Sequence, residues 1–182
     1  MFIQTEPTPN PATLKFLPGK AVMPSGTANF PNADSATRSP LAKRLFAIDG
    51  VTGVFLGSDF VTVTKAPAVE WHVLKPPVLG ALMEHLSADL PVIESGGPEA
   101  APAAPDDGIV GQIKELLETR VRPRVAEDGG DIVFQGFKDG VVYLHMQGSC
   151  SGCPSSTATL KMGIENMLKH YVPEVQRVEA VL

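Results

Sequence analysis

The sequence predicts an α+β protein built from two small mixed domains. Residues 94–107 contain only small residues, Pro and acids, with no Lys or Arg, so they cannot bury apolar surface and are typical of a linker. Short β-branched runs and segments with helical spacing lie on both sides of this stretch. We therefore predict a first domain over 1–93, a Pro/Ala/acidic linker over 94–107 and a second domain over 108–182.

The first domain is predicted to mix strands with two helices. Its apolar, β-branched runs predict these strands: Phe2–Thr5, Thr13–Leu17, Val51–Leu56 and Phe60–Lys65. The last two flank a Gly-Ser-Asp turn and predict a hairpin. Ser39 followed by Pro40 predicts a helix N-terminus, with Ser as the cap and Pro in the first helical position. Pro77 is predicted to open a second helix, whose apolar residues recur at helical spacing as far as Leu90.

The second domain is predicted to have the element order α-β-β-α-β. The predicted elements are a helix with apolar residues from Ile109 to Val121 capped by Asp107, strands over Ile132–Phe137 and Val141–Met146, a helix from Pro154 to Tyr171, and a strand over Val175–Leu182. An Asp-Gly turn predicts that the two middle strands form a hairpin. Pro123 is expected to tighten or bend the end of the first helix.

The charge and hydropathy patterns exclude several classes of protein. The net charge is -5, and four of these negative charges come from the linker, so neither domain presents a strong charge excess. A nucleic-acid binder would normally show a basic excess. No apolar run approaches the ~18 residues of a membrane span, and the N-terminal residues do not resemble a secretory signal. We therefore expect an intracellular protein that binds neither nucleic acid nor membrane.

The only two cysteines, Cys150 and Cys153, form a CxxC motif between a predicted strand and a predicted helix. Backbone N–H groups at a helix start favour thiolate over thiol. The residues alone leave four interpretations open: half of a four-cysteine iron–sulfur site completed by a second subunit, a thioredoxin-like dithiol oxidoreductase, a structural zinc shared by two chains, and thiols without a special role. A hairpin, not a βαβ unit, precedes the motif, which disfavours thioredoxin.

Other polar residues carry weaker signals. The segment Asp128–Asp131 is interpreted as a tight turn between helix and strand, with positioning of the cysteine loop as the alternative. The four histidines have no matched spacing and are interpreted as ordinary surface or half-buried residues; strand alternation accounts for His145. Arg122 and Arg124 fit either a contact for a partner or a solvated helix end.

Longer stretches resemble a known family. The stretches RPRVAEDGGDIVF (122–134) and GSCSGCPSSTATLKMGIENML (148–168) resemble the NifU-like C-terminal domain. The stretches MFIQTEPTPNPATLKFLPGK and FLGSDFVTVTK (55–65), with Trp71, resemble the Nfu N-terminal domain. Apart from the linker, these resemblances cover essentially the whole chain, which is similar to Nfu-type iron–sulfur cluster scaffolds or carriers.

The resemblance implies a cluster carrier and not an enzyme. It implies that Cys150 and Cys153 ligate a [4Fe-4S] cluster, with [2Fe-2S] as a further form, bridged between the subunits of a homodimer. Recipients would be apo iron–sulfur proteins, such as lipoyl synthase or aconitase, and upstream cluster-assembly proteins would be further partners. The cysteine-free N-terminal domain would contact clients or partners. The location would be the bacterial cytoplasm, or the mitochondrial matrix for a mature eukaryotic form.

Overall fold

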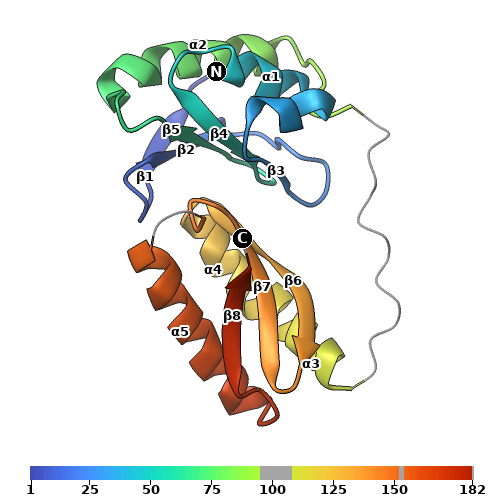
Figure 1. Ribbon diagram of the computed structural model, residues 1–182. Coiled ribbons are helices and arrows are strands. Elements are labelled where there is room, and N and C mark those ends of the chain that lie inside the picture. Colours follow the sequence, from blue (N-terminus) through green and yellow to red (C-terminus); the bar gives the residue numbers. More distant parts are fainter. Residues whose placement is uncertain (95–107, 152–153, 182) are drawn as a thin grey trace. The chain divides into compact units, whose positions relative to one another are not determined.

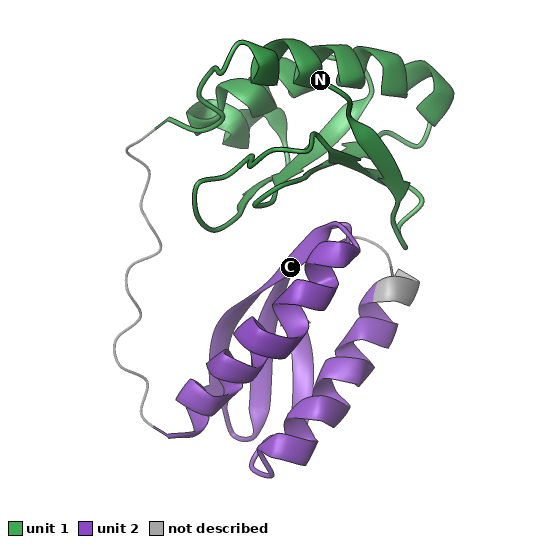
Figure 2. Cartoon of the chain, turned by 180° about the vertical axis from the view of Figure 1, so that it is seen from behind, with its two compact units in different colours: residues 1–97 green, residues 98–182 purple. Residues whose placement is uncertain are grey.

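The computed structural model describes residues 1–94, 108–151 and 154–181, with side chains in the last range from residue 157 onward. The chain divides into two compact units, residues 1–97 and 98–182 (Figure 2). Both contain helices and a sheet, so the predicted α+β class is confirmed. Most of the predicted linker lies outside the described residues, and its bounds stay a prediction.

The first unit is an antiparallel five-stranded sheet with its helices on one side (Figure 1). The strand order is β1-β2-β5-β4-β3. The strands are β1 (Gln4–Pro7), β2 (Thr13–Leu17), β3 (Ala28–Phe30), β4 (Val51–Leu56) and β5 (Val61–Lys65). The helices are the 3-10 helix η1 (Ala33–Arg38), α1 (Pro40–Phe46) and α2 (Trp71–Ser87). Buried aliphatic side chains of α1 and α2 share one core with those of the sheet.

The local signals of this unit are largely confirmed. Strand β2 has the predicted bounds, the β4–β5 hairpin forms, and β1 begins two residues later than predicted. The hydroxyl of Ser39 caps α1, because its Oγ accepts a hydrogen bond from the Ala42 N–H at 3.0 Å. Strand β3 and helix η1 were not predicted. Strand β3 is an edge strand that pairs with β4, and its three residues are too few for a periodic signal.

Helix α2 begins at Trp71, so the predicted start at Pro77 is wrong. Pro76 and Pro77 lie inside the helix and cannot donate hydrogen bonds to the carbonyls of His72 and Val73. Both of these residues are exposed, so water can satisfy the carbonyls. Buried Leu74 lies four residues before buried Val78, which extends the apolar stripe into the first turn.

The second unit follows the predicted order α-β-β-α-β, with a subdivided first helix. Its elements are α3 (Ile109–Leu116), the π-helical turn η2 (Leu117–Val121), α4 (Arg122–Glu127), β6 (Gly130–Lys138), β7 (Val141–Gly148), α5 (Pro154–Tyr171) and β8 (Arg177–Val181). The strand order is β6-β7-β8; β6–β7 is antiparallel and β7–β8 parallel. Asp139 and Gly140 both have positive φ, as the predicted hairpin turn requires.

The first helical segment runs farther than predicted. It passes through the π turn η2 just before Pro123 and continues as α4 to Glu127. A wider turn accommodates proline, whose ring would otherwise clash with the carbonyl four residues earlier. Gly108 occupies the N-cap position of α3, while the predicted cap Asp107 lies outside the described residues. None of the helices within the described ranges has the length and apolar character of a bilayer-spanning segment.

Candidate functional site

Cys150 lies in the loop that leaves β7 and leads to α5, as the sequence predicted. Gly148 ends β7 with a φ of 65°, which turns the chain away from the sheet. The hydroxyl of Thr157 donates a hydrogen bond to the Cys150 carbonyl at 2.9 Å and ties the loop to α5. Cys153 lies outside the described residues, so the geometry of the cysteine pair stays a prediction.

Gly130, the first residue of β6, forms a wall beside the Cys150 thiol. The β6–β7 register pairs Gly130 with Gly148. A Cβ atom on Gly130 would lie 2.6 Å from the Cys150 Sγ and 2.7 Å from the Gln147 carbonyl oxygen. Real Cβ atoms essentially never approach other heavy atoms so closely. The space beside the thiol therefore accepts only glycine at this position unless the loop moves.

The turn before β6 also holds the cysteine loop. The Ser149 N–H donates to the Gly129 carbonyl at 3.3 Å, and the Ser149 hydroxyl donates to the Asp128 carbonyl. Ser149 is 2% exposed, so these bonds satisfy polar groups that water cannot reach. Residues 128–131 are thus the predicted turn between helix and strand, and they also contact the cysteine loop. The turn and the positioning of the cysteine loop, which the sequence left as alternatives, are both present in the structure.

A buried ion pair braces the start of β6. The Asp131 carboxylate accepts two hydrogen bonds from Arg122, from Nε and Nη2, each at 2.8 Å, and one from the Ile132 N–H at 2.8 Å. The Asp131 side chain is only 4% exposed. Hydrogen bonding to Asp131 raises the pKa of the Arg122 guanidinium above its ordinary value. Arg122 also donates a hydrogen bond to Glu118, so its guanidinium group is paired with carboxylates of the same unit.

Burial dominates the electrostatics of Cys150. The residue is 5% exposed, and desolvation raises the pKa of its thiol to about 11. The hydrogen bond with Ser149 opposes this shift, and the charges of Asp128 and Asp131 add to it. Burial of Cys150 therefore opposes the thiolate form that the helix start is expected to favour. Metal binding at this thiol requires loss of its proton.

Residues outside the cysteine loop do not complete a metal site within the described part of the chain. There, no three His, Cys, Asp or Glu side chains lie close enough to hold an ion. His145 sits on β7 with its Nδ1 3.2 Å from the Val181 carbonyl oxygen. His85 is buried in the first unit, where its Nε2 faces the Pro91 carbonyl at 3.1 Å.

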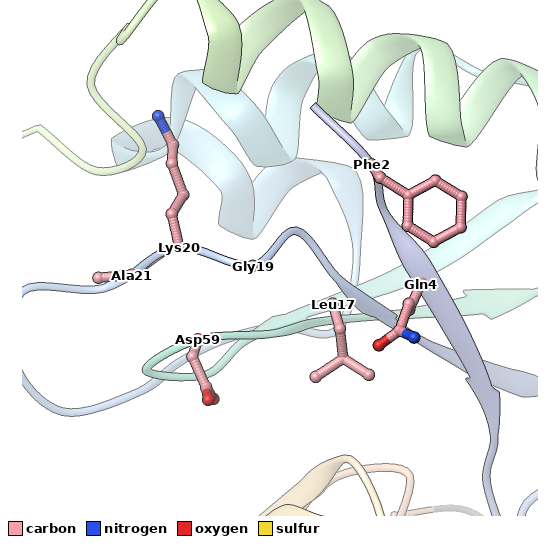
Figure 3. Close-up of a pocket in the computed structure, with 7 residues that line it drawn as sticks. All are labelled: Phe2, Gln4, Leu17, Gly19, Lys20, Ala21 and Asp59. Carbon is pink, nitrogen blue, oxygen red and sulfur yellow. The ribbon is translucent and has the colours of Figure 1, made fainter.

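The first unit carries a pocket of about 500 Å³ that the sequence did not predict (Figure 3). Phe2 and Leu17 supply apolar surface at one end, while Lys20 and Asp59 lie toward the other. The Lys20 ammonium group is already paired with Asp89 at 2.7 Å. The pocket therefore offers mainly apolar surface.

Comparisons with known proteins agree with this organisation. The family model described as "Scaffold protein Nfu/NifU N terminal" matches residues 3–89, and the NifU-like domain model matches residues 113–179. The fold and the cysteine loop thus define a two-domain protein with a NifU-like C-terminal unit. The chain is 52% identical over 184 residues to the human protein named "NFU1 iron-sulfur cluster scaffold homolog, mitochondrial", which aligns with 100% of this chain.

The chain belongs to the Nfu family of scaffold proteins, which confirms the resemblance found in the sequence. It spans 72% of the human protein and 65% of a Drosophila erecta relative of the same name, to which it is 55% identical. The solution structure of a NifU-like protein from Saccharomyces cerevisiae is 30% identical, with a TM-score of 0.48, over 53% of this chain and 87% of that one.

Proposed function

We propose that this protein is an iron–sulfur cluster carrier that holds a [4Fe-4S] cluster between two subunits and passes it to apo-proteins. Cys150 and Cys153 of each subunit would be the ligands. The observation that carries the proposal is a cysteine loop fixed by the turn 128–131, in a chain whose relatives are named iron–sulfur cluster scaffolds. The role is one of binding and delivery, without catalysis.

The number of thiols supports a shared cluster. Iron–sulfur clusters are usually held by four cysteine thiolates, whereas the chain contains two cysteines. A two-fold dimer supplies the missing pair by symmetry. Because the cluster would then bridge the subunits, dimerisation would depend on its presence.

One observation disfavours the dithiol oxidoreductase alternative. An antiparallel hairpin, β6–β7, precedes the cysteine loop, in place of the βαβ unit of a thioredoxin-like motif. The zinc-bridged dimer uses the same ligands, so spectroscopy has to separate it from the cluster carrier.

Anaerobic reconstitution with ferrous iron and sulfide tests the proposal. We expect a broad absorption band at about 400 nm and about four irons per pair of chains. Mössbauer spectroscopy then distinguishes [4Fe-4S] from [2Fe-2S]. Cys150→Ser and Cys153→Ser should each abolish the chromophore, and size-exclusion chromatography should show a dimer that dissociates when a chelator removes the iron. A chromophore retained in both variants would overturn the ligand assignment, and zinc binding without a chromophore in the wild type would favour the zinc dimer.

We further propose that the recipients are apo iron–sulfur proteins, such as lipoyl synthase or aconitase, and that upstream cluster-assembly proteins load the carrier. The first unit, which has no cysteine, would contact these clients. The names of the human and fly relatives place those proteins in mitochondria. These names favour the mitochondrial matrix over the bacterial cytoplasm for this chain.

A further inference from the structure

Building on the proposed role of Cys150 as a cluster ligand, we propose that Gly130 is a positioning residue for the Cys150 thiol and that the Arg122–Asp131 ion pair holds Gly130 in place. These residues keep the Cys150 thiol buried in the second unit. Cluster binding then requires the thiol to leave this wall.

The steric evidence concerns both the thiol and the loop backbone. A Cβ on Gly130 would lie 2.6 Å from the Cys150 Sγ, 2.7 Å from the Gln147 carbonyl oxygen and 3.2 Å from the Cys150 amide nitrogen. Two of these three atoms belong to the backbone, which cannot move away as a flexible side chain can. An alanine at position 130 would therefore displace the loop itself.

Gly130 is fixed in position because the residues before and after it in the chain are hydrogen-bonded. On one side, the Asp131 carboxylate is bound by two N–H groups of Arg122 and by the Ile132 N–H. On the other side, the Gly129 carbonyl accepts the Ser149 N–H at 3.3 Å. Gly130 thus cannot retreat from Cys150 without the loss of charge-assisted, largely buried hydrogen bonds.

The inward position of the thiol has a consequence for loading. Cys150 is 5% exposed and packs in the same core cluster as Ile132, Met146 and Ile164. A sulfur atom buried to this extent offers little surface to iron shared with a second chain. The Ser149–Cys150 segment must turn outward, and the strength of its hold on residues 128–131 sets how readily it does so.

Thiol alkylation tests the positioning role without iron. The full-length Cys153→Ser protein leaves Cys150 as the single thiol, so its reaction with iodoacetamide can be followed by intact mass. Gly130→Ala should raise the rate at least tenfold, which corresponds to about 1.4 kcal/mol. The matched control is Gly136→Ala in the same strand, because nothing lies within 4 Å of a Cβ at that position, and its rate should be unchanged. Circular dichroism at the assay temperature verifies that each variant is folded.

A second pair of variants tests the brace and covers the case in which Gly130→Ala fails to fold. Asp131→Asn removes the charge but keeps the size of the side chain. Because the Asp131 charge also raises the pKa of Cys150, the rates are compared after the pH profile of alkylation has corrected them for the thiolate fraction, and the corrected rate should rise by a smaller factor. Its control is Glu179→Gln, which removes a more exposed ion pair with Lys161 and should leave the rate unchanged. In the two-cysteine protein, Gly130→Ala should also acquire the cluster chromophore faster during reconstitution than Gly136→Ala does.

The outcomes separate this inference from the proposed function. Equal alkylation rates in folded Gly130→Ala and Gly136→Ala proteins, or in folded Asp131→Asn and Glu179→Gln proteins, would overturn the positioning role. The positioning role would also be overturned if Cys150 in the folded Cys153→Ser protein, with Gly130 in place, reacted as fast as it does after unfolding in urea. The expected alkylation rates combined with a wild-type protein that forms no chromophore would instead reject the cluster-carrier function and leave the positioning role standing.

Discussion

Replacement of Arg122 by Met should destabilise the second unit strongly. Met retains much of the apolar stem of Arg but removes its charge and its two hydrogen bonds to Asp131. The Asp131 carboxylate, 4% exposed, would then lose both hydrogen bonds from Arg122 while it retains the one from the Ile132 N–H. Removal of one partner of a buried ion pair costs about 3–5 kcal/mol, and because Arg122 itself is 29% exposed we expect the lower end, ~3 kcal/mol.

The two units can be observed separately, which makes this loss measurable. The only tryptophan, Trp71, lies in the first unit, and both tyrosines, Tyr143 and Tyr171, lie in the second. Tryptophan fluorescence therefore follows unfolding of the first unit, and the tyrosine signal in near-UV circular dichroism follows the second. For a unit of this size each kcal/mol shifts the melting temperature by about 4–8 °C, so the tyrosine transition should fall by about 12–24 °C while the tryptophan transition stays in place.

The control is Lys161→Met, which breaks the Lys161–Glu179 ion pair, whose side chains are 32% and 34% exposed. Pairs exposed to this extent contribute about 0–1 kcal/mol and are screened by salt. The loss in Arg122→Met should persist in concentrated salt, because screening is weak around a buried carboxylate. A loss no larger than that of Lys161→Met, or one that disappears in salt, would refute the reasoning.

Three further predictions concern the first unit, and each is followed by Trp71 fluorescence. Burial lowers the pKa of His85, so the unfolded state binds more protons than the folded state. The free energy of unfolding should be constant above pH ~6.5 and fall below it by at most about 1.4 kcal/mol per pH unit. Urea titrations that give His85→Leu the same dependence of this free energy on pH would contradict the prediction. Gly57→Ala should destabilise the unit, because a Cβ there would lie 2.3 Å from the Phe60 ring. Gly80→Ala lies in open space on α2 and should stabilise the unit by about 0.5–1 kcal/mol. Urea midpoints that move in the same direction in both variants would contradict the steric explanation for Gly57. Ser39→Ala removes the α1 cap and the donor to the Val92 carbonyl and should cost about 1–2 kcal/mol; an unchanged midpoint would show that neither bond contributes to stability.

Several features of the fold could be predicted from the sequence because their causes are local. The cap at Ser39, the Asp139-Gly140 turn and the alternation along β7 each depend on residues a few positions apart. The start of α2 could not be predicted from Pro77. Proline is excluded from a helix interior where the carbonyl that it leaves without a hydrogen-bond donor would be buried. Only the folded chain shows that His72 and Val73, which carry these carbonyls, are exposed.

The sequence by itself determined that the two cysteines lie between a strand and a helix, and it identified the family. It did not determine the state of Cys150, because the residues that control it are distant in the chain. Gly130 and Cys150 are brought together by the β6–β7 register, and Arg122 meets Asp131 only because α4 returns toward β6. Local patterns report which groups a segment offers, whereas burial and pairing of charges depend on which segments pack together. The tertiary structure therefore decided that the Cys150 thiol is buried and held against a glycine.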